Sequence, residues 1–269
     1  MNRTPEDTVL LFHSSASSSR QWQLLIDRLQ PHHRVHAIDL YGHGRRTDWR
    51  GDLPLTVRDE AAHALPLLEG GAVHLVGHSY GGAVAMQLAL MAPQAVRSLV
   101  VYEPVLASWL VDDDPHSGAA REFLAVGAFV EHAMRRGEPE LAAWRFVDYW
   151  GGPGSWTAML PERRQAVAQR MPAVAAHFGA LLAMRLLPSD LAALQAPMLM
   201  LHGASTRAST LRVAELLRAA LPQARHESLH GMGHLGPITH AAEVNACIHA
   251  FIERRLPAMP LAMTALAVA

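Results

Sequence analysis

The chain has 269 residues, half of them hydrophobic, and its formal net charge is −1. This length is enough for one large core, or for one core with an inserted subdomain. A near-neutral chain without a run of basic residues is not expected to bind nucleic acid. The basic residues are all arginine, which excludes Schiff-base chemistry and a Ser–Lys dyad, and the single cysteine, Cys247, excludes an internal disulfide.

Neither end of the chain has the pattern of a targeting or membrane segment. The first residues, MNRTPEDTVLLFH, lack an apolar run long enough for a signal peptide. The last residues, LPAMPLAMTALAVA, contain two prolines and are too short to span a bilayer. We therefore expect a cytoplasmic protein that does not enter a membrane, with residues 259–269 as an apolar tail.

Short apolar runs alternate with segments of helical period along most of the chain. The runs predict six buried strands, at residues 8–13, 34–40, 72–78, 97–103, 197–203 and 224–230. The amphipathic segments predict helices near residues 20–29, 56–69, 80–92, 208–221 and 238–255. This alternation is typical of βα units, so we predict an α/β fold with a mostly parallel, doubly wound sheet of about six strands.

One long interval interrupts the alternation. Between residues 106 and 189 there is no buried-strand run, and helical patterns such as AAREFLAVGAFVEHAMRR dominate. A helical block between two strands of one sheet predicts an inserted cap. The expected organisation is a core formed by residues 1–105 and 190–258, a helical cap at 106–189 and the tail at 259–269.

The strongest motif lies between the third predicted strand and the helix after it. Residues 77–81, GHSYG, fit the pattern G-x-S-x-G in the strand–turn–helix context that this motif requires. A nucleophile on such a sharp turn adopts strained backbone angles, and the flanking glycines avoid clashes with neighbouring chain. Ser79 would then lie at a helix N-terminus, where developing negative charge is stabilised. The motif therefore predicts a nucleophilic serine.

Five stretches of the chain, in this order, are similar to the α/β-hydrolase superfamily: LLFHSSASSSRQW, IDLYGHGRR, VGHSYGG, VVYEPV and GMGHLGP. The resemblance covers essentially the whole chain, and the serine turn and the late histidine are its specific markers. It implies a sheet that carries a helical cap. The family usually has two further strands at its N-terminus, so the resemblance implies a trimmed version of the sheet here.

A nucleophilic serine needs a base, and no lysine is present to act as one. His234 lies in the Gly-flanked loop LHGMGHLGP after the last predicted strand. This position matches the catalytic histidine of the family, which follows the nucleophile late in the chain. The resemblance therefore implies that His234 is the base.

A competing metal motif occurs in the same region. Residues 226–230, HESLH, match H-E-x-x-H, which binds zinc when both histidines project from one face of a helix. Pro222 ends the preceding helix and Gly231 follows at once, so a helix does not fit, and Gly236 occupies the position of a third histidine. We predict no metal at this motif, and the predicted serine chemistry implies no cofactor.

The acid of a triad is absent from its usual place. Most of the family carries an aspartate in a G-x-x-D turn, and here that turn, residues 203–206, ends in Thr206. Glu103 ends the strand after the nucleophile's strand, at the edge of the sheet where sites form. Some α/β-hydrolases, including a group of haloalkane dehalogenases, carry the acid at this strand end, so the resemblance implies that Glu103 is the acid. Asp112, Asp113 and Asp114 are the fallback.

An acyl transfer also needs an oxyanion hole. The backbone N–H of Tyr80, directly after the nucleophile, is one expected donor. The family commonly has a donor after a His-Gly pair that corresponds to HSSASS here, which implies Ser15, with Ser14 as the alternative. Aromatic and apolar residues of the cap and the histidine loop are expected to line an apolar pocket. The candidates are Trp150, Trp156, Tyr149, Trp109 and Leu235.

Together these residues predict a serine hydrolase that cleaves a carboxylic ester of a small or medium apolar molecule through an acyl-enzyme. Serine at the turn argues against dehalogenase and epoxide-hydrolase chemistry, which use an aspartate nucleophile. Hydrolysis of a carbon–carbon bond, lactone opening and cofactor-free perhydrolysis use similar groups and stay open. So does a non-catalytic, ligand-binding descendant of the fold, because the aspartate is missing from its usual slot.

Overall fold

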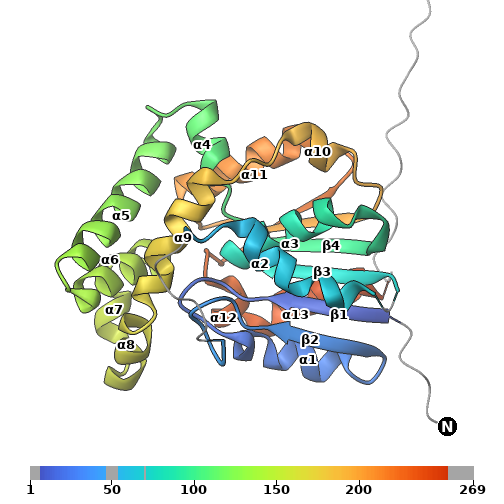
Figure 1. The fold of residues 1–269 in the computed structure, drawn as a ribbon, viewed down its shortest axis with the longest axis horizontal. Coiled ribbons are helices and arrows are strands. Elements are labelled where there is room, and N and C mark those ends of the chain that lie inside the picture. The colour runs from blue at the N-terminus through green and yellow to red at the C-terminus, as the bar shows by residue number, and fades with distance from the viewer. Residues whose placement is uncertain (1–6, 47–53, 70, 254–269) are drawn as a thin grey trace, which may run out of the picture.

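The computed structural model describes residues 7–46, 54–69 and 71–253 (Figure 1). The tail that we expect at residues 259–269 lies outside these described residues. Among the described residues, each helix is either too short or too polar to span a bilayer.

The centre of the structure is one parallel sheet of six strands in the order β2-β1-β3-β4-β5-β6. The strands are β1 (Asp7–Phe12), β2 (His33–Ile38), β3 (Val73–His78), β4 (Val96–Tyr102), β5 (Met198–Gly203) and β6 (Arg225–Leu229). Every residue of β3 is buried, as expected for a central strand covered on both faces. The predicted α/β, doubly wound, mostly parallel sheet is confirmed, and each strand ends within two residues of its predicted bounds.

Helices cover both faces of this sheet (Figure 1). One face carries α1 (Gln23–Leu29) and α13 (Ala241–Ile252), which pack on each other. The other carries α2 (Val57–Ala64), α3 (Tyr80–Met91), α10 (Pro188–Ala192) and α11 (Ala208–Ala220). Alternate side chains of a strand point to opposite faces. Leu10 and Phe12 therefore join the core under α3, and Val9 and Leu11 join the core under α1 and α13.

Short 3-10 segments complete the sheet half of the molecule. They are Ser19–Trp22, Leu65–Leu68 and Pro93–Ala95, and the short helix α12 (Gly236–Thr239) precedes α13. The start of α2 is fixed by a capping box, in which the Thr56 hydroxyl accepts from the Asp59 N–H and the Asp59 carboxylate accepts from Thr56.

A helical insert separates β4 from β5 and lies at one end of the sheet (Figure 1). Its helices are α4 (Ala107–Asp113), α5 (Gly118–Arg135), α6 (Pro139–Gly151), α7 (Ser155–Ala158), α8 (Pro161–Ala168) and α9 (Met171–Ala183). Aromatic contacts of Phe178 with Phe123 and Phe146 hold α5, α6 and α9 together. Because α9 also packs on α2 and α3, the insert stands directly over the turn where α3 begins.

Candidate active site

The turn that carries Ser79 connects β3 to α3 and is strained. Ser79 has φ 59° and ψ −122°, a conformation that side-chain-bearing residues rarely adopt. The flanking glycines have no room for a side chain. A Cβ on Gly77 would lie 2.4 Å from the Gly81 carbonyl oxygen, and a Cβ on Gly81 would lie 2.3 Å from the His13 carbonyl oxygen. The motif therefore reflects a backbone that only this spacing of glycines allows.

His234 lies in the loop between β6 and α12, between two other predicted residues. Its Nε2 is 2.8 Å from Ser79 Oγ, and its Nδ1 is 2.7 Å from Glu103 Oε2. All three side chains are buried. An ionised carboxylate only accepts, so Nδ1–H donates to Glu103 and leaves the Nε2 lone pair facing the serine hydroxyl. The structure thus brings the three residues together in the order serine, histidine, carboxylate.

Glu103 follows β4 directly and has φ 45°, a second strained position. Its two oxygens are both engaged. Oε1 accepts the Gly203 N–H at 2.7 Å, and Oε2 accepts the Thr206 hydroxyl at 2.8 Å in addition to the His234 Nδ1–H. The hydrogen-bonding capacity of this buried carboxylate is therefore met. Thr206, in the slot where an aspartate was expected, acts as a donor to the glutamate of the neighbouring strand.

The other predicted acids lie away from His234. Asp113 ends α4 and forms an exposed ion pair with Arg212 of α11, and its neighbours Asp112 and Asp114 are also exposed. The segment Arg225–Leu229 is strand β6, so the HESLH motif does not sit on a helix.

Several groups hold the imidazole and its loop in place. The ring of Trp150, from α6 of the insert, stacks on the His234 ring with centroids 3.8 Å apart. His78 Nε2 lies 2.8 Å from the His234 carbonyl oxygen, and Gln21 Nε2 lies 3.0 Å from His78 Nδ1. Burial holds the pKa of His78 well below its usual value, so His78 is neutral at pH 7. The Tyr102 hydroxyl donates to the Gly233 carbonyl at 2.8 Å.

The residues predicted to form the oxyanion hole, Tyr80, Ser14 and Ser15, lie beside Ser79. Tyr80 belongs to a helix N-terminus, and the two serines belong to a loop held by side-chain hydrogen bonds. Tyr80 is the first residue of α3, and the first N–H groups of a helix have no intrahelical partner. Ser14 uses both its N–H and its hydroxyl to bond Gln21 Oε1, at 3.1 Å and 3.0 Å. Ser15 is bound through its side chain, since its Oγ lies 2.7 Å from Nδ1 of His177 in α9.

His177 also contacts the turn that carries Ser79. Its ring stacks on the Tyr80 ring with centroids 3.6 Å apart and an interplanar angle of 7°. The loop that carries Ser15 is braced from below by His13, whose Nδ1–H donates to the Ser14 carbonyl at 2.7 Å and whose Nε2 accepts the Leu40 N–H at 3.1 Å. One histidine of the insert and one of the sheet therefore fix this loop.

A cavity of about 400 Å³ opens above Ser79 and His234. Of the residues predicted for the pocket, Trp150 and Leu235 line it. Tyr149, Trp109 and Trp156 do not, because they serve the packing of the insert. The Tyr149 hydroxyl bonds Ser209 Oγ at 2.7 Å, Trp109 Nε1–H donates to the Leu186 carbonyl, and Trp156 is buried beside the start of α8.

Three arginines line the same cavity: Arg20, Arg163 and Arg170. None of them forms an ion pair with a carboxylate within the described residues, and no acidic residue lies among the described lining residues. Arg170 Nη1 donates to the Ala16 carbonyl at 3.1 Å, and the other two are exposed. The sequence analysis identified neither these arginines nor His177, because no motif marks them. Arg163, Arg170 and His177 lie on or beside α8 and α9, so their place depends on how these helices pack over the sheet, whereas Arg20 lies in the 3-10 segment Ser19–Trp22.

Comparisons with known proteins agree with this fold and with hydrolytic chemistry. A model of the alpha/beta hydrolase family matches residues 9–246. The pimeloyl-[acyl-carrier protein] methyl ester esterase of Yersinia pseudotuberculosis is 28% identical over 247 residues, which cover 91% of this chain and 93% of that protein. The lipase LipV of Mycobacterium tuberculosis is 36% identical over 141 residues, 52% of each chain.

Solved structures show the same fold at low sequence identity. MenH from S. aureus superposes with a TM-score of 0.73 at 18% identity and covers 94% of this chain and 96% of its own. A thermophilic esterase from Thermogutta terrifontis superposes with a TM-score of 0.70 at 22% identity, covering 92% and 90%. At these identities the likeness concerns the fold alone.

Proposed function

The chain belongs to the alpha/beta hydrolase family, and from this premise we propose that it is a serine hydrolase that cleaves a carboxylic ester of a small or medium molecule through an acyl-enzyme. One observation carries the proposal. Ser79, His234 and Glu103 form a continuous chain of hydrogen bonds of 2.8 Å and 2.7 Å at the floor of a largely apolar cavity.

In this proposal His234 Nε2 takes the proton of Ser79 as the serine oxygen attacks the ester carbonyl. The imidazolium that forms is stabilised by Glu103 and then gives its proton to the leaving alcohol. The stacked ring of Trp150 adds a favourable contact with the same cation. Water then attacks the acyl-enzyme with His234 again as base, which releases the acid and restores Ser79.

The tetrahedral intermediate needs donors for its oxyanion. The arrangement favours the backbone N–H groups of Tyr80 and Ser15 for this role. The N–H of Ser14 is the weaker candidate, since Gln21 already occupies it. A donor of this type contributes roughly 3–4 kcal/mol to transition-state stabilisation in acyl-transfer enzymes.

The spaces around Ser79 favour an ester with a short alcohol part. Besides the cavity of about 400 Å³, a second space of about 20 Å³ borders Ser79, Phe123 and Phe178. A space of that size holds about one water-sized or methyl-sized group. We therefore assign the alkoxy group to the small space and the acyl chain to the large one. A methyl ester esterase among the relatives of this chain supports the assignment.

The arginines of the cavity favour an acyl chain that ends in an anionic group. Arg20, Arg163 and Arg170 add three positive charges to a lining that is otherwise polar-neutral or apolar. A carboxylate or phosphate at the far end of the acyl chain would pair with a guanidinium there. The proposed substrate is thus an ester with a short alcohol and an acid part that is apolar near the ester and anionic at its end.

A fluorophosphonate probe tests the chemistry independently of the substrate. We expect rapid, stoichiometric labelling of the protein and none of a Ser79→Ala variant, together with hydrolysis of p-nitrophenyl esters by the unmodified protein only. Slow labelling and no turnover would identify a non-catalytic ligand-binding protein. Labelling without ester turnover, but with release of acid from lactones or carbon–carbon substrates, would replace the ester proposal with one of those reactions.

A panel of esters then tests the substrate class. We expect methyl esters to be cleaved faster than butyl esters of the same acid, because the space beside Ser79 has no room for a longer alcohol. We expect half-esters of dicarboxylic acids to have a lower KM than neutral esters of equal length. Equal rates across both series would overturn the size and charge assignments and leave the serine mechanism intact.

A further inference from the structure

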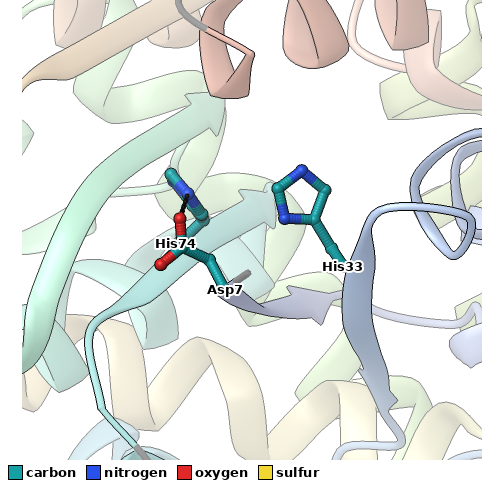
Figure 2. Close-up of side chains that lie close together, drawn as sticks. All are labelled: Asp7, His33 and His74. Atoms are coloured by element: carbon teal, nitrogen blue, oxygen red, sulfur yellow. Dashed lines mark ion pairs between the residues drawn. The ribbon is translucent and has the colours of Figure 1, made fainter. Parts of the chain in front are cut away.

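A second cluster of titratable residues lies at the opposite edge of the sheet from Ser79. Asp7 and His33 are the first residues of β1 and β2, and His74 is the second residue of β3. The parallel register places Asp7 beside His33, and Val9 of the same strand beside His74. One ligand atom from each of the three residues lies within 4.8 Å of the others (Figure 2). Since a strand rises about 3.3 Å per residue, this cluster is roughly 16 Å from the serine along β3.

In each histidine of the cluster, one ring nitrogen has a hydrogen-bond partner outside the cluster, and the other ring nitrogen points into the cluster (Figure 2). His33 Nε2–H donates to Glu253 Oε1 at 2.8 Å, while His33 Nδ1 is buried and has no hydrogen-bond partner among the described residues. His74 Nδ1 lies 2.7 Å from Ser98 Oγ, which leaves Nε2 toward Asp7. This is how proteins orient metal-binding imidazoles, with the outer nitrogen on a carboxylate or hydroxyl and the inner lone pair directed inward.

The distances within the cluster suit a small divalent ion. His74 Nε2 lies 3.5 Å from Asp7 Oδ2, which is long for a hydrogen bond. Two ligands of a tetrahedral zinc ion, each about 2.05 Å from it, are about 3.4 Å apart. Arg97 Nε lies 3.1 Å from the same Asp7 oxygen, so an ion pair holds the carboxylate in place.

We propose that Asp7, His33 and His74 form a zinc site, with water as the fourth ligand. Two imidazoles and one carboxylate form a donor set that zinc prefers. The ion ties together the beginnings of three strands and, through Glu253, the end of α13. Because the serine lies at the other edge, the ion takes no part in the proposed ester hydrolysis.

The test uses the full chain prepared without an affinity tag and freed of metal with EDTA. Isothermal titration with ZnCl2 should show one zinc ion per chain, and zinc should raise the melting temperature. His33→Gln and Asp7→Asn should each weaken zinc binding by about 100-fold or more. Ser98→Ala removes only an outer partner and should weaken it by about 10- to 100-fold. Hydrolysis of a p-nitrophenyl ester should be unchanged in all three variants.

The matched control is His230→Gln, which removes an exposed histidine of the HESLH motif and should bind zinc as the unmodified protein does. Circular dichroism of each metal-free variant separates loss of the site from loss of the fold. Zinc affinity that is equal in the unmodified protein and His33→Gln would overturn the proposal. A second result would also overturn it: the unmodified protein takes up no zinc, and the variants melt at a lower temperature than it does in EDTA. The cluster would then be a hydrogen-bond network only.

Discussion

The sheet and the helical insert build the candidate site by different means. The sheet contributes Ser79, Glu103 and His234 from loops at its carboxyl edge, and two of these residues have forced backbone angles, with φ 59° at Ser79 and 45° at Glu103. The insert contributes side chains through packing. Trp150 stacks on His234, and His177 stacks on Tyr80.

This difference separates the proposed chemistry from the proposed selectivity. The proposed reacting groups Ser79 and Glu103 lie at strained backbone positions, so changes there should lower kcat. Side chains on the packed helices of the insert can be replaced without refolding the turns. Such replacements should therefore act mainly on KM, or lower kcat by a smaller factor than replacements at the turns.

The largest loss of activity is expected when the carboxylate of Glu103 is replaced. Glu103→Gln keeps the shape of the side chain but places an amide beside His234 Nδ1, which favours the wrong tautomer of the imidazole. We expect kcat for a p-nitrophenyl ester to fall by about 10³- to 10⁴-fold with little change in KM. Steady-state kinetics and the rate of fluorophosphonate labelling both report this loss.

Thr206→Val is the matched control for that experiment. It removes one hydrogen bond to Glu103 Oε2 and leaves the carboxylate and its contact with the Gly203 N–H in place. We expect a loss of about tenfold or less, as for one hydrogen bond to a charged group. Near-native turnover in Glu103→Gln with a large loss in Thr206→Val would reverse the assignment of the acid.

The second-largest loss of activity is expected from a change in the insert, which tests whether the insert also supports the proposed oxyanion donors. His177→Phe keeps a flat ring against Tyr80 but loses the contact with Ser15 Oγ. We expect kcat to fall by about 10- to 100-fold, less than the loss of a whole oxyanion donor. In a Ser15→Ala background the same change should have little further effect. An undiminished loss there would show that His177 acts by another route.

The sequence predicted the sheet edge far better than the insert, for physical reasons. Four of the strands, β1, β3, β4 and β5, are largely buried apolar runs between turns, and all six strands were located within two residues. Ser79 and His234 lie in motifs that encode a turn or a loop, and Glu103 was recognisable because a carboxylate ends an apolar strand. Ser79 was predicted from such a local signal, whereas the roles of His234 and Glu103 were implied by the resemblance to the α/β-hydrolase superfamily.

Residues of the insert carry no such signal. The pattern of an amphipathic helix says which face is apolar but not which aromatic ring reaches the site. Trp150 and Trp156 are six residues apart and similar in sequence context, yet only Trp150 lines the cavity. The cluster of Asp7, His33 and His74 was missed for a related reason, since it arises from the register of three strands that are far apart in the chain.

The third effect concerns the cavity arginines. Arg163→Gln should raise the KM for a half-ester of a dicarboxylic acid by about 3- to 10-fold, with kcat unchanged, because one exposed ion pair is worth about 1 kcal/mol. The KM for a neutral ester of the same length should stay constant. Arg164→Gln is the matched control, since the neighbouring arginine does not line the cavity. Equal KM changes for both esters would show that Arg163 serves packing, not charge recognition.

The smallest effect concerns the boundary between the sheet and the insert, where three buried histidines meet. The His177 ring stacks on His43, and His43 contacts His13. Burial lowers the pKa of His13 to about 3 and that of His43 to about 4, and it holds the pKa of His177 well below its usual value. Glu60 Oε1 lies 3.9 Å from His177 Nε2, but this carboxylate also accepts from the Tyr41 N–H, and burial remains the largest influence.

These histidines are neutral in the folded protein and take up protons when it unfolds, so the free energy of unfolding should fall as the pH falls below about 6.5. One such histidine lowers the folding equilibrium constant by about fourfold at pH 6 and by about tenfold for each further pH unit, until its folded pKa is reached. The His177→Phe variant should take up one proton fewer when it unfolds, so its free energy of unfolding should depend less on pH. Urea denaturation at pH 7 and pH 6 measures the change, and an equal pH dependence in both proteins would mean that His177 is already charged in the folded state.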